Sequence, residues 1–264
     1  MITAWLGFLM AGAISGLLAG LFGVGGGLII VPILLWVFAW QGMEGAFVIH
    51  VAIATSLAAI SITSLSSVWA HHKLANTQWH LVKQLAPTLV IGSAIGAYIT
   101  SLLSKESLQF WFGLFAIFAA VKLWLPAPKE VSVRLLLKPV ILLYGAITGV
   151  ISAMVGIGGG TFIVPYLVMS GLSIQKAVGT AAACGFPIAV SGIITYMIIG
   201  QAHQPVTTSW QTGFVNWQAF VGIVSTSIWM APVGAKIATK LSATLLSRLF
   251  SVLLLFIGVM FIMR

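Results

Sequence analysis

Long apolar runs separated by short polar breaks fill this chain of 264 residues. A helix needs about 20 apolar residues to cross roughly 30 Å of hydrocarbon. Runs of about that length predict a triplet of single transmembrane helices in each half of the chain, at 46–70, 79–103 and 107–125 and at 174–200, 217–240 and 243–263. A longer run, 3–40 or 139–170, precedes each triplet.

Each of the two longer runs is interrupted by a glycine cluster. Gly23–Gly27 is followed by Leu28–Pro32, and Gly156–Gly160 is followed by the similar segment Thr161–Pro165. Adjacent glycines disfavour continuous helix and leave the backbone uncovered. In hydrocarbon such a backbone must be buried in protein or line a cavity. Each longer run is therefore predicted to form a broken, re-entrant hairpin.

The two halves repeat the same order of elements, which predicts an internal duplication. Insertions fall between the apolar runs, as expected when loops absorb them. We expect a first repeat at 1–126, a polar linker at 127–138 and a second repeat at 139–264. The residues that match are Gly16 with Gly149, Pro32 with Pro165, Ala52 and Thr55 with Ala177 and Thr180, Trp79 with Trp217, and Gly96-Ala97 with Gly234-Ala235.

The composition excludes a soluble globular protein. With 60% hydrophobic and 6% charged residues, the chain has too little polar surface to cover a soluble fold of its size. The net charge of +9 would suggest a nucleic-acid partner in a soluble protein. Here most basic residues flank apolar runs, so we expect the lipid bilayer and no nucleic acid as the partner.

The basic residues also distinguish two topologies. If each glycine-broken hairpin enters and leaves on one side, all lysines and arginines except Lys105 and Arg264 share one face. If it crosses once, they are divided almost evenly. The positive-inside rule favours the first arrangement. We therefore predict an all-α polytopic inner (plasma) membrane protein of two inverted repeats, each a re-entrant hairpin followed by three transmembrane helices, with the linker cytoplasmic and both termini outside.

The small number of cysteine and carboxylate side chains argues against an enzyme. Cys184 is the single cysteine, which excludes an internal disulfide, and the only carboxylates are Glu44, Glu106 and Glu130. No carboxylate pair, metal-ligand cluster or activated nucleophile is recognisable, so no metal and no cofactor are expected. We interpret Cys184 as a small buried packing residue. A buried-carboxylate proton relay is likewise unavailable.

The facing hairpin tips are the expected binding site for a small anion. In inverted repeats such tips meet near the bilayer midplane, where helix N-termini offer N–H groups and the positive end of the dipole. The alternative is that the glycines only allow close helix packing. The predicted substrate-binding residues are Gly23, Gly25, Gly26, Gly27, Thr55, Ser56, Gly158, Gly159, Gly160, Thr161, Thr180 and Ser191.

Three histidines receive separate interpretations. His50 lies in an apolar run, where a polar group is a functional candidate, although the start of that helix also fits an interfacial position. Coupling would use His50, the protonation of the substrate or the membrane potential. His71 and His72 close the helix 46–70 and are expected to be a solvated helix end.

The paired segments Gly16–Pro32 and Gly149–Pro165, each followed by an Ala-x-x-Thr helix, resemble the TauE/SafE family of sulfite and organosulfonate exporters. The likeness covers nearly the whole chain. It implies a transporter that moves sulfur-containing anions, commonly outward, and we expect alternating access around the tips. The extra residues at 41–50 make the first-half site depart from the family pattern. A passive anion channel and an uptake permease for a sulfur-containing or carboxylate anion stay as alternatives, and the oligomeric state is left open.

Overall fold

The computed structural model describes residues 2–23, 26–43, 45–124, 137–203, 210–238 and 243–263. Almost all of them are helical, so the predicted all-α architecture is confirmed. The one element outside that prediction is a short hairpin in which Gln211 pairs with Asn216. In chain order the elements are α1 (Ile2–Phe22), α2 (Gly27–Trp40), α3 (Val48–Lys73), α4 (Trp79–Ser101), α5 (Lys105–Trp124), α6 (Lys138–Val155), α7 (Gly160–Met169), α8 (Ile174–His203), β1 (Gln211–Thr212), β2 (Val215–Asn216), α9 (Trp217–Ala238) and α10 (Ala243–Ile262).

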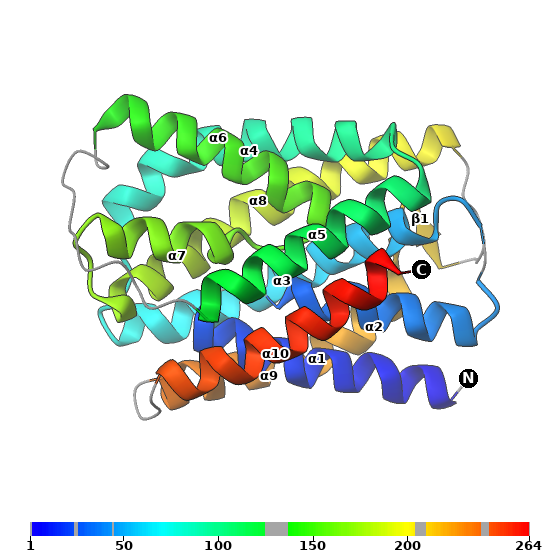
Figure 1. Cartoon of the computed structure of the whole chain (residues 1–264), viewed down its shortest axis with the longest axis horizontal. Helices are drawn as coiled ribbons and strands as arrows, with labels where there is room; N and C mark the ends of the chain where they lie inside the picture. Colours follow the sequence, from blue (N-terminus) through cyan, green and yellow to red (C-terminus); the bar gives the residue numbers. More distant parts are fainter. Residues whose placement is uncertain are drawn as a thin grey trace.

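The helices lie roughly along one axis of the molecule, as Figure 1 shows. Among the residues described, α1, α3, α4, α6, α8 and α9 are long and apolar enough to cross a membrane. The helices that follow the glycine clusters are shorter, with 14 residues in α2 and 10 in α7. The chain is therefore a multi-pass membrane protein, as the apolar runs predict.

Both glycine clusters interrupt a helix and turn the chain back. A methyl group on Gly7 would touch Val37, and one on Gly26 would lie 2.6 Å from the Ser15 carbonyl oxygen, so α1 and α2 run antiparallel. Figure 1 shows α1 and α3 starting at the right-hand end, and α6 and α8 starting at the left-hand end. Each hairpin thus returns to the end of the bundle from which its first helix starts.

Hydrogen bonds between the two halves occur in matched pairs. The Thr55 hydroxyl accepts a bond of 2.9 Å from the backbone N–H of Asn216, directly before α9. The Thr180 hydroxyl accepts one of 3.0 Å from the N–H of Gln78, directly before α4. The two threonines are equivalent in the predicted repeat, and so are the two helix starts. Each half therefore caps a helix of the other half in the same way.

A second matched pair joins the middles of these helices. Ser66 on α3 donates a bond of 2.6 Å to the carbonyl of Ile228 on α9. Ser191 on α8 donates one of 2.7 Å to the carbonyl of Val90 on α4. The same residue offset that aligns the threonines aligns the two serines. This agreement between sequence alignment and hydrogen bonding supports the duplication.

Helices of the two halves also pack against one another in matched pairs. α1 packs along α9 and α6 packs along α4, so the first helix of each hairpin lies against the fourth helix of the other repeat. Glycines make this close approach possible: a methyl group on Gly234 would clash with Leu17, and one on Gly96 would clash with Val150. These two contacts are equivalent in the repeat.

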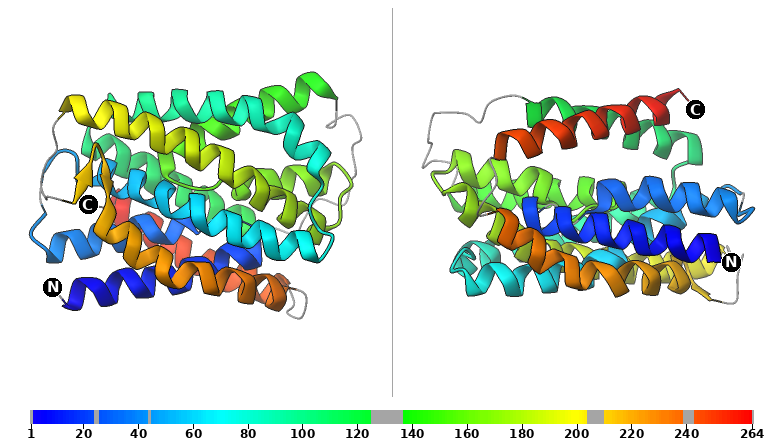
Figure 2. Two further views of the ribbon diagram at one scale, coloured as in Figure 1. Left: turned by 180° about the vertical axis from the view of Figure 1, so that it is seen from behind. Right: turned by 90° about the horizontal axis from the view of Figure 1, so that it is seen from below.

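Equivalent helices run in opposite directions where they meet. A methyl group on Gly192 of α8 would touch Leu57 of α3, and one on Gly185 would lie near Ser64, so residue numbers rise in opposite senses. α5 and α10 pair in the same antiparallel way and form a separate layer in the right-hand view of Figure 2. An antiparallel relation between equivalent helices is the relation that an inverted repeat requires, and it supports that prediction.

The basic helix ends gather at one end of the bundle. α3 ends at Lys73, α6 begins at Lys138 and α9 carries Lys236 in its last turn. Figure 1 shows these helix ends on the left, whereas α5, which begins at Lys105, starts on the right. The first helix starts and the last helix ends on the right as well. Lys129, Arg134, Lys240 and Arg264 lie outside the described residues.

Candidate anion-binding site at the glycine tips

We call Gly23–Gly27 the first tip and Gly156–Gly160 the second tip. In both, a glycine in the left-handed region directly precedes the returning helix: Gly26 has φ 75° before α2, and Gly159 has φ 76° before α7. Neither helix start has a side-chain cap. The first N–H groups of an α-helix have no partner inside the helix. Both tips therefore present backbone donors and the positive end of a helix dipole.

The two tips touch each other in the interior. A methyl group on Gly27 would clash with the Gly156 carbonyl and would lie 2.9 Å from Cα of Ile157. Each tip also presses on the long helix of the other half, Gly23 on Val178 and Gly156 on Ile53. Close packing therefore explains part of the glycine pattern. The packing interpretation and the anion-binding interpretation apply to the same glycines. Backbone N–H groups of two helices can come together only where no side chains keep the helices apart.

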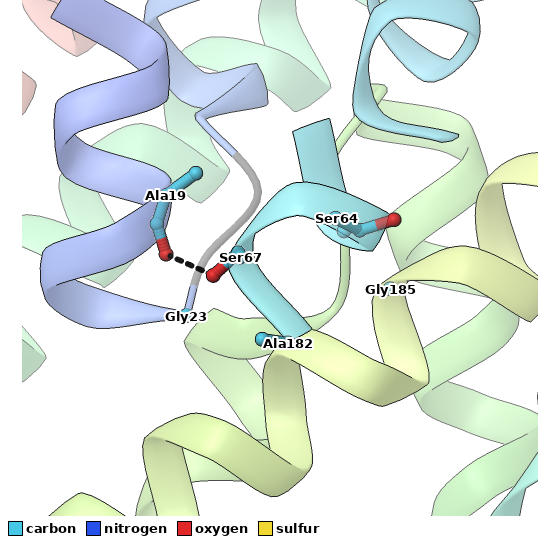
Figure 3. Close-up of a pocket in the computed structure, with 7 residues that line it drawn as sticks. Ala19, Gly23, Ser64, Ser67, Ala182 and Gly185 are labelled. Carbon is cyan, nitrogen blue, oxygen red and sulfur yellow. Dashed lines mark hydrogen bonds between the residues drawn. The ribbon is translucent and has the colours of Figure 1, made fainter. Parts of the chain in front are cut away.

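A small cavity lies between the tips on the side of the basic helix ends. Figure 3 shows its wall, in which Ala19 and Gly23 come from the first hairpin, and Ser64 and Ser67 come from α3. Gly158 of the second tip, with Ala182 and Gly185 of α8, completes the lining. The Ser67 hydroxyl donates a bond of 3.4 Å to the Ala19 carbonyl. The space between these residues admits no water-sized sphere, so the site is closed to a ligand in this structure.

Two hydroxyl groups beside the second tip have no hydrogen-bond partner among the described residues. They belong to Ser152, which is fully buried one turn before Gly156, and to Thr161, which is 8% exposed and follows Gly160. An unsatisfied buried hydroxyl costs roughly 1–3 kcal/mol. Such a cost at a helix break is removed when a ligand with acceptor oxygens binds.

Comparison with known proteins gives one consistent result. The sequence profile described as "Sulfite exporter TauE/SafE" matches residues 8–261. The chain belongs to this family. A "Probable membrane transporter protein" of Haemophilus influenzae is 34% identical over 260 residues, covering 98% of each chain. Proteins described in the same words from Methanocaldococcus jannaschii and Bacillus subtilis are each 28% identical, covering 89% and 94% of this chain and 86% and 93% of their own. No solved structure matches the chain significantly.

The family and these relatives make the chain a membrane transporter. The predicted resemblance to TauE/SafE exporters is thus confirmed. The relatives are named as transporters, in agreement with the expectation that the chain is not an enzyme. Among the described residues, no group of three or more histidine, cysteine or acidic side chains is placed to hold a metal ion.

The other hydroxyls that the sequence predicts for the site of this TauE/SafE protein already make hydrogen bonds within the protein. Ser56 donates a bond of 2.8 Å to the carbonyl of Gly156 and so braces the second tip. Thr55, Thr180 and Ser191 make the matched bonds between the halves and do not line the cavity. They support the tips from the surrounding helices, whereas Thr161 is the predicted hydroxyl that stays unpaired. Gly25 lies outside the described residues.

The histidines are placed differently from one another. His50 is buried near the start of α3, where Nε2 donates to the carbonyl of Thr100 at 3.1 Å and Nδ1 is unpaired. His72 is exposed at the end of α3, as expected. His71 is 2% exposed, so the expectation of a solvated group is wrong for it. The reason is that α1 packs across the end of α3, and Nε2 of His71 reaches the Gly20 carbonyl at 3.0 Å.

Sequence reasoning missed three serines of the site. Ser64 and Ser67 line the cavity, and Ser152 carries one of the unpaired hydroxyls. A signal for the first two existed, because 61–67 concentrates hydroxyl residues in an apolar helix and residues three apart share a helix face. Ser152 gave no such signal, since it is an isolated serine one turn before a glycine. Cys184 is fully buried, in agreement with its interpretation as a packing residue.

Proposed function

We propose that this protein exports sulfite or an organosulfonate across the plasma membrane by alternating access, with the anion bound between the two glycine tips. The observation that carries the proposal is the meeting of two uncapped helix starts beside the unpaired hydroxyls of Ser152 and Thr161. The chain belongs to a family of sulfite exporters, which supports the substrate class.

The chemistry of the tips favours an oxyanion over a cation or a neutral solute. The groups there that have no partner inside their helix or among the described residues can all donate hydrogen bonds: the first backbone N–H groups of α2 and α7, and the hydroxyls of Ser152 and Thr161. No acidic or basic side chain lines the cavity. A hydrogen bond to a charged partner contributes roughly 1.5–3 kcal/mol, so a few such bonds offset much of the cost of dehydrating a small anion. A sulfonate or sulfite group has three oxygens that accept such bonds from several directions.

Alternating access is supported over a passive channel by the closed cavity and the matched halves. The gaps between the tips are too narrow for water in this structure. The hydrogen bonds of one half have counterparts in the other, so the bundle can rock between two related arrangements around a fixed site. The membrane potential assists export, because expelling one negative charge from a negative interior gains about 2.3 kcal/mol per 100 mV.

The orientation in the membrane is part of the proposal. The basic helix ends would face the cytoplasm and the Lys105 end would face outward, which places both termini outside. In this orientation the cavity lined by Ser64 and Ser67 lies on the cytoplasmic side of the tips. An exported anion would therefore meet the serines of α3 before it meets the tips.

Transport in proteoliposomes tests the proposal. Vesicles loaded with sulfite, sulfoacetate, taurine, thiosulfate or acetate should show saturable efflux and counter-exchange for sulfite or a sulfonate.

Thr161→Val and Ser152→Ala should each lower the apparent affinity by about tenfold, because each removes a donor worth about 1.4 kcal/mol. Thr195→Val is the matched control, since its hydroxyl donates to Ser191 O within α8, away from the tips. Non-saturating flux would identify a channel, and unchanged affinity in both site variants would refute the site.

A further inference from the structure

Two equivalent side chains, one in each half, join a long helix to the first helix of the hairpin in the same half. Each donates a hydrogen bond to a backbone carbonyl of that hairpin helix. His71 on α3 donates from Nε2 to the carbonyl of Gly20 on α1, at 3.0 Å. Tyr196 on α8 donates from its hydroxyl to the carbonyl of Ala153 on α6, also at 3.0 Å. The offset that aligns Thr55 with Thr180 aligns His71 with Tyr196, and the offset between the hairpins aligns Gly20 with Ala153.

The two positions differ in one chemical property. Tyrosine has a single donor, which the bond to Ala153 uses, and its unperturbed pKa is about 10. Histidine has a second ring nitrogen and titrates between about pH 5 and pH 8. A carbonyl oxygen only accepts hydrogen bonds, so Nε2 of His71 carries the proton of the neutral ring. Nδ1 is then a bare acceptor, buried and without a partner among the described residues.

His71 lies one helical turn from the lining of the cavity between the tips. Ser67, one turn earlier on the same face of α3, lines that cavity, and so does Ala19, the neighbour of Gly20. In the proposed transport path, an anion that moves from the cavity to the basic end of the bundle would pass this position. A proton on Nδ1 would turn the bare acceptor into a charged donor and would leave the bond to Gly20 intact.

Among the residues that the structure describes, the surroundings offer no acidic partner for a charged His71; Glu130 of the linker lies outside them. Glu106 is the one described carboxylate, and it lies at the opposite end of the bundle, at the start of α5. α1 and α2 carry no titratable side chain. The charged or protonatable groups described at the His71 end, on α3 itself and on the elements around it, are His72, Lys73, His80, Lys83, Lys122, Lys138, Lys176, Lys236 and Arg248, all of them basic. Tyr144, Tyr166 and Cys184, which also lie on the elements around it, lose their protons only at alkaline pH and so do not supply a negative charge. The counter-ion for a protonated His71 would therefore be the anion in the cavity.

We infer that His71 is a binding residue at which a proton on Nδ1 and the transported anion bind together, and that Tyr196 is its non-titrating counterpart at the other end. The inference rests on the proposed function. The proton comes from water or from the acid form of the substrate, and no covalent bond to carbon or sulfur changes. Acid on the His71 side promotes anion binding there, whereas Tyr196 itself does not change its protonation in this pH range.

Sided membrane vesicles test this inference, with a sulfonate as the probe because it stays anionic at all pH values used. With the potential clamped, the apparent KM on the His71 side should rise about tenfold or more between about pH 6 and about pH 8. His71→Tyr copies the bond of Tyr196 and should still transport, with less than about twofold pH dependence. His71→Gln is the second variant, in case the tyrosine does not fit, and Tyr196→His should add pH dependence on the opposite side.

His50→Gln is the matched control, because His50 is also buried with an unpaired Nδ1 but lies at the opposite end of α3. It should keep the pH dependence of the wild type. Dependence that persists in both His71 variants, that disappears in His50→Gln, or that is missing from the wild type would overturn the inference while leaving transport itself established. Absence of sulfonate and sulfite flux at every pH would instead overturn the proposed function.

Discussion

Replacement of Gly27 by alanine probes the contact between the two tips with little other disturbance. Gly27 opens α2 and has no positive φ, so the new side chain does not strain the backbone. Alanine is also the better helix former, by up to about 1 kcal/mol. The added methyl group acts only on the second tip. It would lie 2.9 Å from Cα of Ile157, where an ordinary contact begins at 3.4 Å, and closer still to the Gly156 carbonyl.

The tips would therefore separate by at least about 0.5 Å, the difference between these two distances. Overpacking of this kind costs roughly 1–3 kcal/mol, which exceeds the gain in helix propensity. We expect a moderate loss of stability and a larger loss of transport, on the order of tenfold or more, because binding groups displaced by a fraction of an ångström no longer converge on the anion.

Gly12→Ala is the matched control for this substitution. A methyl group on Gly12 would lie 2.8 Å from the carbonyl carbon of Ile223, which is a comparable clash, but it separates α1 from α9 and not the two tips. Thermal unfolding in detergent and sulfite efflux from proteoliposomes measure the two effects. Wild-type transport in Gly27→Ala, or an equal loss of transport in both variants at equal stability, would show that the tip contact has no special role.

Two further predictions concern the repeat and the topology. Thr55→Val and Thr180→Val should each lower the free energy of unfolding by about 1 kcal/mol, since each leaves one helix-start N–H without its acceptor; clearly unequal losses in thermal unfolding would speak against equivalent roles. Cysteines introduced at the exposed positions Gln41 and Leu74 should react with an impermeant thiol reagent from opposite sides of the membrane, and labelling of both from the same side would rule out the proposed orientation.

The apolar pattern predicted most of the helices because membrane spans leave a long and unambiguous signal. The hairpin expected at 3–40 consists of α1, Ile2–Phe22, and α2, Gly27–Trp40, and the helix expected at 79–103 is α4, Trp79–Ser101. The strands at Gln211–Thr212 and Val215–Asn216 were missed, because two-residue strands leave no periodicity to detect. The expected start of the linker lies outside the described residues, whereas its expected last residue, Lys138, is the first residue of α6.

The site was harder to predict because alignment identifies equivalent residues but not the direction in which their side chains point. Thr55 and Thr180 are equivalent in the two repeats, but both hydroxyls face the start of a helix and not the tips. His71 has the sequence context of a helix end in solvent, but α1 covers it. These environments depend on the packing of α1 and α6 against helices of the other half. No local sequence pattern predicts that packing.

This packing between the halves also sets the order in which the protein can be assembled. α1 leaves the ribosome well before α9, yet α9 is the helix along which α1 packs. α4 likewise waits for α6. The nascent first half therefore enters the bilayer with its glycine-lined surfaces unmatched, and the two halves become a folded protein only together, in a late closing step that involves both.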